Sequence, residues 1–187
     1  MKKTVKFVLG ALIVIAAIIF VFRLYGYLAE RAARRAYPIK YESLVKSYSA
    51  EFDVPESIIY AVIRTESAFD PNALSRAGAA GLMQITPDTY DWLLFLRREE
   101  ADRSLYDPET NIKYGVYFLS YLKSHFGEWE TAFAAYNAGF SRVNGWLDDP
   151  RYSENGRLVD IPYPETDDYV KKVVSAAEKY KNIYDID

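Results

Sequence analysis

The feature that most constrains the fold is a helix-start pattern that occurs three times along the chain. In each copy a side chain that can accept a hydrogen bond precedes a proline, and an acid follows in the first turn. The copies are Asp53-Val54-Pro55-Glu56, Thr86-Pro87-Asp88 and Asp107-Pro108-Glu109. Such residues satisfy the unpaired N–H groups at a helix start, where proline fits because it has no N–H to pair. The pattern predicts helices that begin after positions 53, 86 and 107.

The remaining signals are also helical. No stretch alternates polar and apolar residues as a half-buried strand does. Helical spacing is clearest at Tyr41, Leu44, Val45 and Tyr48. Gly127 is predicted to end the helix that begins after 107, and a short helix over residues 129–137 is predicted to end at Gly139. Thr166 is predicted to cap the last helix. Residues 140–164 are expected to form a long loop. The sequence therefore predicts one mostly α domain at 37–187.

The first 36 residues have a different composition. Phe7–Phe22 contains sixteen residues without a charge and follows three lysines. As a helix it would span about 24 Å, slightly less than a hydrocarbon core of about 30 Å. Lys6 and Arg23 can extend their charged ends to the two membrane surfaces. We expect residues 1–36 to be one N-terminal transmembrane helix and a linker, the linker starting at Glu30.

Two other interpretations of Phe7–Phe22 fit the sequence less well. A cleaved signal peptide needs a small-residue site after its apolar core, but Arg23-Leu24-Tyr25 follows here. A buried core helix fits poorly, because an apolar helix flanked by lysines suits lipid better than a protein interior. We therefore expect an uncleaved anchor, with export after signal cleavage as the alternative. Basic residues lie on both sides of the run, so charge does not predict its orientation.

Composition excludes several classes of function. Residues 1–35 carry a net charge of +6 and the remainder −9, so the globular part is a poor nucleic-acid binder. There is no cysteine, which excludes thiolate zinc sites, disulfides and lipid attachment through cysteine. His125 is the one histidine, so neither a zinc site nor a histidine-based triad is expected. We expect no metal and no cofactor.

One acid interrupts an apolar helix face. After Asp53 the apolar residues Ile59, Val62 and Ile63 share a face, and Glu66 continues it. A partly desolvated carboxyl group has a raised pKa, and one that is protonated near neutral pH can act as a general acid. Alternatively, Glu66 belongs to a frayed last turn of the helix and its side chain points into water.

Two small-residue segments accompany this acid. Residues 77–81 are Ala-Gly-Ala-Ala-Gly, a backbone that a ligand or a neighbouring helix can approach closely, and Met83 and Gln84 follow. Later, Tyr136 and Asn137 stand at a helix end among alanines and Gly139. Each feature alone is more typical of a packing turn, a core position or a cap than of a binding site.

Taken together, these segments resemble a known family. They correspond to three motifs: Glu66-Ser67, Gly81-Leu82-Met83-Gln84 and Ala135-Tyr136-Asn137-Ala138-Gly139. In this order and spacing they resemble the lytic transglycosylases with a soluble-lytic-transglycosylase (goose-lysozyme-like) domain. Two further segments fit that family: residues 107–112 with Gly115, and Pro164-Glu165-Thr166 with Tyr169-Val170. The resemblance covers about residues 42–182.

The resemblance implies a lysozyme-like α domain that cleaves peptidoglycan, the bacterial cell-wall polymer, between N-acetylmuramic acid and N-acetylglucosamine. Glu66 would be the general acid and then the general base. The residues expected to contact the glycan strand are Ser67, Ser75, Met83, Gln84, Tyr136, Asn137 and Glu165. Phe140 departs from the family pattern, since many members have proline after this glycine. The substrate would place the domain outside the cytoplasmic membrane.

Three functions are compatible with these residues. The first is a lyase that forms 1,6-anhydromuramyl ends, which is favoured because no second acid in the motifs stands as a nucleophilic partner of Glu66. The second is a hydrolytic muramidase, which needs a second carboxylate. Asp70 is the nearest in sequence, although Asp70-Pro71 is more typical of a turn, and Glu165 is its rival. The third is an inactive glycan-binding module, which has no need for a buried acid.

Overall fold

We describe the protein from a computed structural model that covers residues 2–101 and 104–187. The side chains of residues 1–9, 11, 13 and 14 also lie outside the described part, and so does part of the predicted anchor at Phe7–Phe22. Backbone contacts divide the chain into two units, Met1–Pro38 and Ile39–Asp187.

The first unit is a single helix, α1, at Lys2–Ala36. The linker that the sequence predicts from Glu30 is therefore helical as far as Ala36. An ion pair between Arg34 and Glu30, 3.0 Å apart and one turn along the helix, supports the helix at this point. Among the residues that the structure describes, no helix has the length and apolar character needed to cross a membrane.

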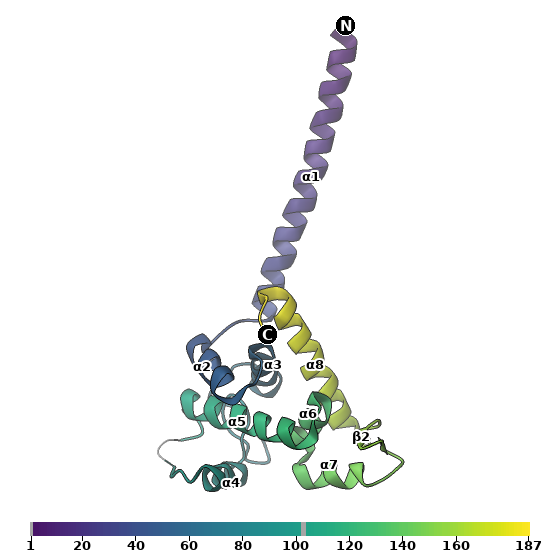
Figure 1. Ribbon diagram of the computed structural model, residues 1–187. Coiled ribbons are helices and arrows are strands. Elements are labelled where there is room, and N and C mark those ends of the chain that lie inside the picture. Colours follow the sequence, from purple (N-terminus) through teal and green to yellow (C-terminus); the bar gives the residue numbers. More distant parts are fainter. Residues whose placement is uncertain (1, 102–103) are drawn as a thin grey trace. The chain divides into compact units, whose positions relative to one another are not determined.

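The second unit is mostly α, as the sequence predicts, with one small hairpin (Figure 1). Its elements within the described residues are α2 (Glu42–Phe52), α3 (Glu56–Ser67), α4 (Pro87–Arg97), α5 (Pro108–Phe126), α6 (Trp129–Ala138), α7 (Phe140–Leu147), β1 (Ser153–Glu154), β2 (Arg157–Leu158) and α8 (Pro164–Tyr184). Helix α3 packs against α8, α5 packs against both α2 and α6, and α6 also packs against α8. The apolar core lies between these helices.

Two of the four predicted N-caps are confirmed. The side chain of Thr86 accepts a hydrogen bond from the Thr89 amide, and that of Asp107 accepts one from the Thr110 amide. Asp53 is not a helix start, because it ends α2 with a left-handed backbone (φ 55°) and α3 begins at Glu56. In the last helix, α8 begins at Pro164, so Thr166 lies inside its first turn and is not the cap.

The predicted loop at 140–164 is wrong in two places. Helix α7 occupies its first part, where Val143 and Trp146 are buried three residues apart. A two-stranded antiparallel hairpin follows, with Ser153 paired to Leu158. Its turn is Asn155-Gly156, and both residues have positive φ (53° and 76°), as the tightest hairpin turns require. The Asn155-Gly156 pair is a hairpin-turn signal that is present in the sequence.

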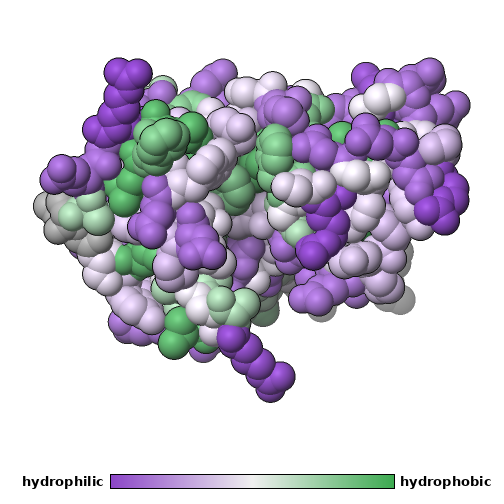
Figure 2. Space-filling view, turned by 90° about the horizontal axis from the view of Figure 1, so that it is seen from below, coloured by the Kyte–Doolittle hydropathy of each residue, from purple (hydrophilic) through white to green (hydrophobic). Residues whose placement is uncertain are grey.

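Apolar side chains also gather on the outside of α4. Figure 2 views the domain from the side that lies at the bottom of Figure 1 and shows hydrophobic residues on the half of this face where α4 lies. On α4 itself, Phe95 has 79% of its surface accessible, and the neighbouring Leu96 is also exposed.

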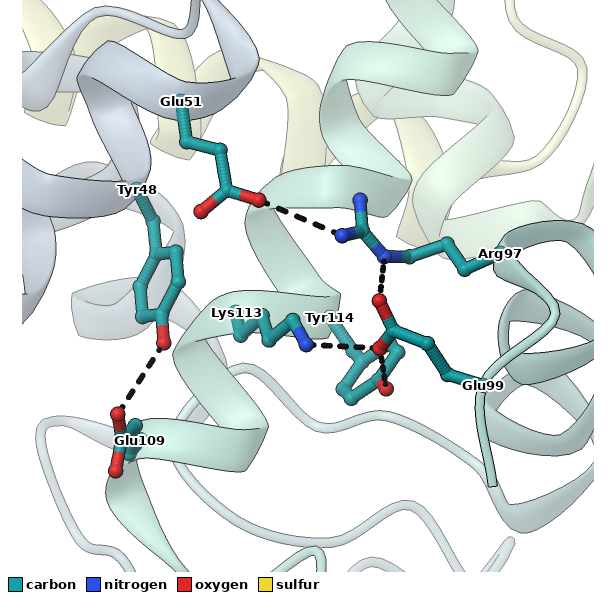
Figure 3. A network of polar contacts seen from close by, with 7 residues as sticks. All are labelled: Tyr48, Glu51, Arg97, Glu99, Glu109, Lys113 and Tyr114. Atoms are coloured by element: carbon teal, nitrogen blue, oxygen red, sulfur yellow. Dashed lines mark hydrogen bonds and ion pairs between the residues drawn. The ribbon is translucent and has the colours of Figure 1, made fainter. Parts of the chain in front are cut away.

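A polar network joins α2, the end of α4 and α5 (Figure 3). Arg97 lies 2.8 Å from Glu99 and 3.5 Å from Glu51. Glu99 also accepts hydrogen bonds from Lys113 at 2.8 Å and Tyr114 at 2.6 Å. These contacts fix the chain as it leaves α4. None of the five residues belongs to the predicted site.

Candidate active site

Glu66 lies in the last turn of α3, where the helix leaves the core. Residues 57–63 of this helix are buried, whereas Glu66 is half-buried. The next two residues, Ala68 and Phe69, have positive φ values of 51° and 67°. This left-handed backbone ends the helix and turns the chain away, so the carboxyl group stays at the edge of the core.

Burial changes the acidity of Glu66. It raises the pKa of the carboxyl group from 4.5 to about 7, against the opposing effect of one hydrogen bond from Tyr169. The Tyr169 hydroxyl, on α8, donates to Glu66 Oε1 at 2.7 Å. Near neutral pH the carboxyl group is therefore present both protonated and ionised, so it can give a proton away and take one back. The raised pKa expected for Glu66 from the sequence pattern agrees with this geometry.

Tyr136, at the end of α6, belongs to the same electrostatic environment. Its hydroxyl donates to the backbone oxygen of Met83 at 2.7 Å. Burial, followed by the nearby charge of Glu66, raises the pKa of both Tyr136 and Tyr169 well above the ordinary value. Both side chains are therefore neutral phenols, which donate hydrogen bonds without adding a charge to the site.

The small-residue loop is held in place by Asn111 of α5. This side chain is fully buried, and its amide nitrogen donates to the backbone oxygens of Ala80 and Leu105, both at 2.8 Å. Its amide oxygen accepts from the Met83 N–H at 2.6 Å. A Cβ atom at Gly81 would lie 2.3 Å from the Asn111 amide, so Gly81 is required by packing against α5 and by its positive φ of 78°.

Met83 is placed differently from its predicted role. Its side chain is fully buried, and a Cβ atom at Gly115 of α5 would lie 2.4 Å from its sulfur. The Met83 side chain therefore has no exposed surface with which to make the predicted contact with the glycan strand. Met83 instead anchors the loop on α5, and its carbonyl oxygen holds the Tyr136 hydroxyl.

The polar residues of the loop support its backbone. The Gln84 side-chain nitrogen donates to the carbonyl oxygens of Gly81 at 2.9 Å and Ala73 at 3.1 Å. Ser67 Oγ lies 2.8 Å from the carbonyl oxygen of Leu82, and Ser75 Oγ accepts from the Ala79 amide at 3.0 Å. Because both hydrogens of the Gln84 amide point to backbone oxygens, this side chain can offer a ligand only its own oxygen.

Two predicted residues lie near the start of α8. Asn137 is exposed, and its amide oxygen accepts a hydrogen bond of 2.8 Å from the buried hydroxyl of Thr166. Its amide nitrogen is thus the group available to a ligand. Glu165 is exposed in the first turn of α8, one helical turn before Tyr169. Asp70 lies in a turn, where its side chain accepts from the Asn72 amide at 2.9 Å.

Sequence reasoning assigned no role in the site to three residues that organise it. These residues are Asn111, Thr166 and Tyr169. Thr166 and Tyr169 share the face of α8 that carries the buried Val170 and Val173. A hydroxyl on an apolar helix face requires a hydrogen-bond partner when it is buried, and that signal was available in the sequence. Among the described residues, no three acids or histidines gather in a way that could hold a metal ion.

Comparison with known proteins gives a family match over most of the second unit. Residues 43–157 match the model of the transglycosylase SLT domain family. The chain is 36% identical over 165 residues to the soluble lytic murein transglycosylase of Escherichia coli K12, a match that covers 85% of this chain and 25% of that protein. It is 31% identical over 169 residues to a membrane-bound lytic murein transglycosylase C of Actinobacillus pleuropneumoniae, covering 77% and 46%.

A solved structure has the same fold. It is an inactive glutamate-to-glutamine mutant of the lytic transglycosylase Slt from Pseudomonas aeruginosa, with a TM-score of 0.70 and 33% identity. The match covers 78% of this chain and 24% of that one. The chain thus spans about a quarter of the Escherichia coli relative and less than half of the Actinobacillus one. Its fold and its motifs together place it in the transglycosylase SLT domain family, to which it belongs.

Proposed function

We propose that the chain is a peptidoglycan lytic transglycosylase, which cleaves the β-1,4 bond between N-acetylmuramic acid and N-acetylglucosamine without adding water. The observation that carries this proposal is the state of Glu66. Its carboxyl group has a pKa of about 7 and accepts a hydrogen bond from the neutral Tyr169. The names of the soluble and membrane-bound relatives point to the same activity.

In the first step, protonated Glu66 gives its proton to the glycosidic oxygen. The bond from C1 of N-acetylmuramic acid to that oxygen breaks, and positive charge develops at C1 and the ring oxygen. The 2-acetamido oxygen of the same sugar stabilises this charge from the other side of the ring. The Tyr169 hydroxyl meanwhile steadies the new carboxylate through its bond to Oε1.

In the second step, the Glu66 carboxylate takes the proton from the C6 hydroxyl of the same sugar. Oxygen O6 then bonds to C1 and closes a 1,6-anhydro ring, which returns Glu66 to its protonated form. An intramolecular hydroxyl held near C1 has a high effective concentration, so it outcompetes water. A pKa near 7 suits both steps, because one group must be an acid and then a base.

The positions of the other acids favour the lyase over a muramidase. Asp70 is exposed and its carboxylate accepts the Asn72 amide within a turn. Glu165 is exposed on the first turn of α8. Neither acid shares a hydrogen bond with Glu66 in the part of the chain that the structure describes. In this mechanism Glu165 contacts substrate or supports charge.

The groups available for substrate binding have complementary polarity. Gln84 offers its amide oxygen, because its nitrogen is held by two carbonyl groups. Asn137 offers its amide nitrogen, because its oxygen accepts from Thr166. We assign the acceptor Gln84 to substrate N–H or O–H groups and the donor Asn137 to substrate oxygens. Ser67 and Ser75 contribute by holding the loop that carries Gln84.

Product masses test the reaction. Purified peptidoglycan is digested with the protein, and the released fragments are separated and weighed. We expect muramyl ends that are lighter by one water than hydrolytic products and that have no reducing power. Ordinary reducing muramic ends would instead establish a muramidase, and Asp70 and Glu165 would then be the acids to substitute. The absence of any released fragment would favour a glycan-binding module.

We also propose that α1 anchors this domain to the outer face of the cytoplasmic membrane. The support comes from the uncharged run Phe7–Phe22 and its flanking lysines, and from a substrate that lies outside the membrane. One relative is named membrane-bound and another soluble, so the family has both forms. A domain tethered in this way works on nearby glycan strands.

Membrane extraction and protease access test the anchor. We expect the full chain to stay in the membrane pellet at alkaline pH, and a chain without residues 1–36 to appear in the supernatant. Protease added to intact spheroplasts should remove the domain. Protection until the cells are lysed would place the domain in the cytoplasm, and a full chain found in the supernatant would exclude anchoring.

A further inference from the structure

The domain has a cavity that the proposed reaction does not use. Its volume is about 790 Å³, and neither Glu66 nor any predicted substrate contact is among its described lining residues. The chain that leaves β2 lines it with residues 158–161, and α8 lines it with Asp167, Val170 and Lys171. Figure 1 shows β2 beside the first turns of α8. The end of α5 and the first turn of α6 complete the wall, so the cavity is separate from the candidate active site.

The first turn of α6 presents unpaired hydrogen-bond donors at this cavity. Its N-cap residue, Glu128, makes no side-chain hydrogen bond to the turn, and its carboxylate pairs instead with Arg157 of β2 at 3.1 Å. The backbone N–H groups of Trp129, Glu130 and Thr131 have no acceptor among the residues that the structure describes. A helix start of this kind carries partial positive charge and favours an anionic group.

Thr131 adds a side-chain hydroxyl at the same place. Only 4% of the surface of this residue is exposed, yet its hydroxyl takes part in no hydrogen bond in the described part of the chain. Among the described residues, the Tyr60 hydroxyl is the one buried side-chain polar group that has neither a partner nor contact with solvent. The Thr131 hydroxyl therefore keeps some accessible surface, and because Thr131 lines the cavity, that surface faces it. Buried hydroxyl groups normally have a partner, so this arrangement points to a ligand at the start of α6.

The charged groups of the cavity have both signs. Asp167 pairs with Lys171 at 2.6 Å, so these two charges compensate each other. Lys123, Glu130 and Asp160 also line the cavity, and none of them forms an ion pair with another described residue. A purely anionic ligand would meet the carboxylates of Glu130 and Asp160, whereas a purely cationic one would meet Lys123 and the start of α6. A group that carries both charges avoids both conflicts.

Apolar surface lies beside these charges. Leu158, Val159, Ile161 and Val170 line the cavity together with Trp129. Val159 has 59% of its surface exposed, and Leu158 and Ile161 are half-buried. An aliphatic chain that covers these side chains removes apolar surface from water.

We propose that this cavity, the α6–α8 site, binds a zwitterionic amino-acid group, with its ammonium and its carboxylate on one carbon, that is attached to an aliphatic chain. The carboxylate of the ligand accepts hydrogen bonds from the first turn of α6 and from the Thr131 hydroxyl. The ammonium pairs with Asp160, and the chain covers Leu158 and Ile161. Free amino acids and wall peptides with an unlinked diamino acid are two sources of this group. The α6–α8 site does not depend on the proposed reaction.

Three small probes of equal chain length test the charges: norleucine, hexanoate and hexylamine. Fluorine NMR of the full chain in detergent, labelled with 5-fluorotryptophan, reports their binding. Trp129 lines the α6–α8 site, whereas Trp92 lines a different cavity and Trp146 is buried. We expect norleucine to shift the Trp129 signal saturably and to leave the other two unchanged. It should bind about tenfold more tightly than hexanoate or hexylamine, since each of these lacks one charged contact.

Substitutions test the two assigned contacts. Thr131→Val keeps the shape of the side chain and removes its hydroxyl, and Asp160→Asn removes the charge. Each should weaken norleucine binding about tenfold, and Thr131→Ser should retain most of the affinity. Asp168→Asn is the matched control, because Asp168 is an exposed aspartate next to Asp167 on α8 but outside the cavity. Circular dichroism shows whether each variant keeps the fold.

Four results would overturn the inference. The first is a Trp129 signal that does not respond to norleucine. The second and third are equally tight binding of hexanoate, which would indicate a simple anion site, or of hexylamine, which would indicate a cation site. The fourth is unchanged affinity in folded Thr131→Val and Asp160→Asn.

Muropeptides with an unlinked diamino acid then distinguish the two sources of the ligand. They are added to the full chain carrying Glu66→Gln, so that no cleavage occurs. A shift of the Trp129 signal at lower concentration than norleucine requires would assign the α6–α8 site to wall peptides, and a weaker response would assign it to free amino acids. Because binding is measured without cleavage, a failure of the proposed reaction would appear separately, in the product masses of the unsubstituted protein.

Discussion

Two glutamates of this domain show how far the surroundings can move one kind of side chain. Glu66 and Glu99 each accept a hydrogen bond from a tyrosine hydroxyl, at 2.7 Å and 2.6 Å. The pKa of Glu66 is nevertheless raised to about 7, whereas that of Glu99 is lowered to about 2. The tyrosine is thus not what distinguishes them.

The difference lies in the balance between burial and cations. Burial acts on both carboxyl groups and opposes ionisation. At Glu99 it is outweighed by hydrogen bonds from Lys113, Tyr114 and Arg97, which all favour the carboxylate (Figure 3). At Glu66 the hydrogen bond from Tyr169 is the only opposing effect given by the described residues. One glutamate can therefore be protonated near neutral pH, and the other stays ionised and joins the end of α4 to α5.

The largest effect that separates the two is on activity. Glu66→Gln keeps the shape of the side chain and removes its proton, so peptidoglycan cleavage should fall by a factor of about 100 to 10,000. Glu99→Gln is the matched control, because Glu99 lies in the network of Figure 3 and not at the site, and it should keep most of the activity. Release of soluble fragments from purified peptidoglycan measures both variants.

An active Glu66→Gln protein would exclude Glu66 as the general acid. Equal losses of activity in both variants would show that the assay reports loss of folded protein, because Glu99 lies in the network of Figure 3 and not at the site. Thermal unfolding of each variant under the assay conditions separates these explanations.

The second effect is on stability, and it depends on pH. Folding raises the pKa of Glu66 from 4.5 to about 7, so ionisation of this group opposes folding. The cost is absent below pH 4.5, where the group is protonated in both states, and is complete above pH 7. Glu66→Gln should therefore raise the free energy of unfolding by about 3 kcal/mol at pH 8 and by almost nothing at pH 4.

Urea unfolding of the two proteins across this pH range measures the difference. A gain that is the same at every pH would mean that the substitution acts through packing. A loss of stability at pH 8 would mean that the Glu66 carboxylate is stabilised by the fold, contrary to the raised pKa.

The third effect has the opposite sign. Folding lowers the pKa of Glu99 from 4.5 to about 2, so its stabilising contribution is complete above pH 4.5 and is lost as the pH falls through about 2. Solvent screens the group because its side chain is 30% exposed. Glu99→Gln should therefore cost about 1 kcal/mol at pH 7 and progressively less towards pH 2, again measured by urea unfolding. A cost that grows on acidification would contradict the network.

Much of the fold follows from the sequence where one local rule dominates. The caps at Thr86 and Asp107 were predictable because each side chain can accept a hydrogen bond from the amide three residues later, which has no carbonyl partner within the helix. Asp53 was misassigned because the same residue type can end one helix or begin the next, and only the short gap between α2 and α3 decides. Helix α7 was missed because eight residues give too little of a periodic pattern to read.

The sequence pattern predicts the raised pKa of Glu66, but it does not predict which residues contact Glu66. An apolar helix face ending on Glu66 indicates a desolvated carboxyl group from local spacing alone. The partner Tyr169 lies 103 residues further along the chain, and nothing local connects the two. Met83 shows the reverse problem, since its place in a motif suggests substrate contact while its side chain is buried on Gly115. Contacts between distant segments decide both cases.

The smallest predicted effect concerns Tyr169, and it tests whether this tyrosine tunes Glu66. Its hydroxyl stabilises the carboxylate, because the hydrogen bond lowers the pKa of Glu66 against the larger effect of burial. Tyr169→Phe removes that bond and leaves the carboxyl group more easily protonated. The pKa of Glu66 should rise further above 7.

The pH dependence of kcat/KM reports this change, since the alkaline limb follows loss of the proton from the free enzyme's general acid. In Tyr169→Phe the limb should move to higher pH, even if the maximum rate falls because the weaker acid gives up its proton less readily in the first step. Tyr136→Phe is the control, because the Tyr136 hydroxyl bonds to the Met83 carbonyl and not to Glu66, so its limb should stay in place. A limb that moves to lower pH in Tyr169→Phe would mean that the hydroxyl had favoured the protonated acid. The comparison of the two glutamates would then lose its basis, because a tyrosine would act in opposite ways at Glu66 and Glu99.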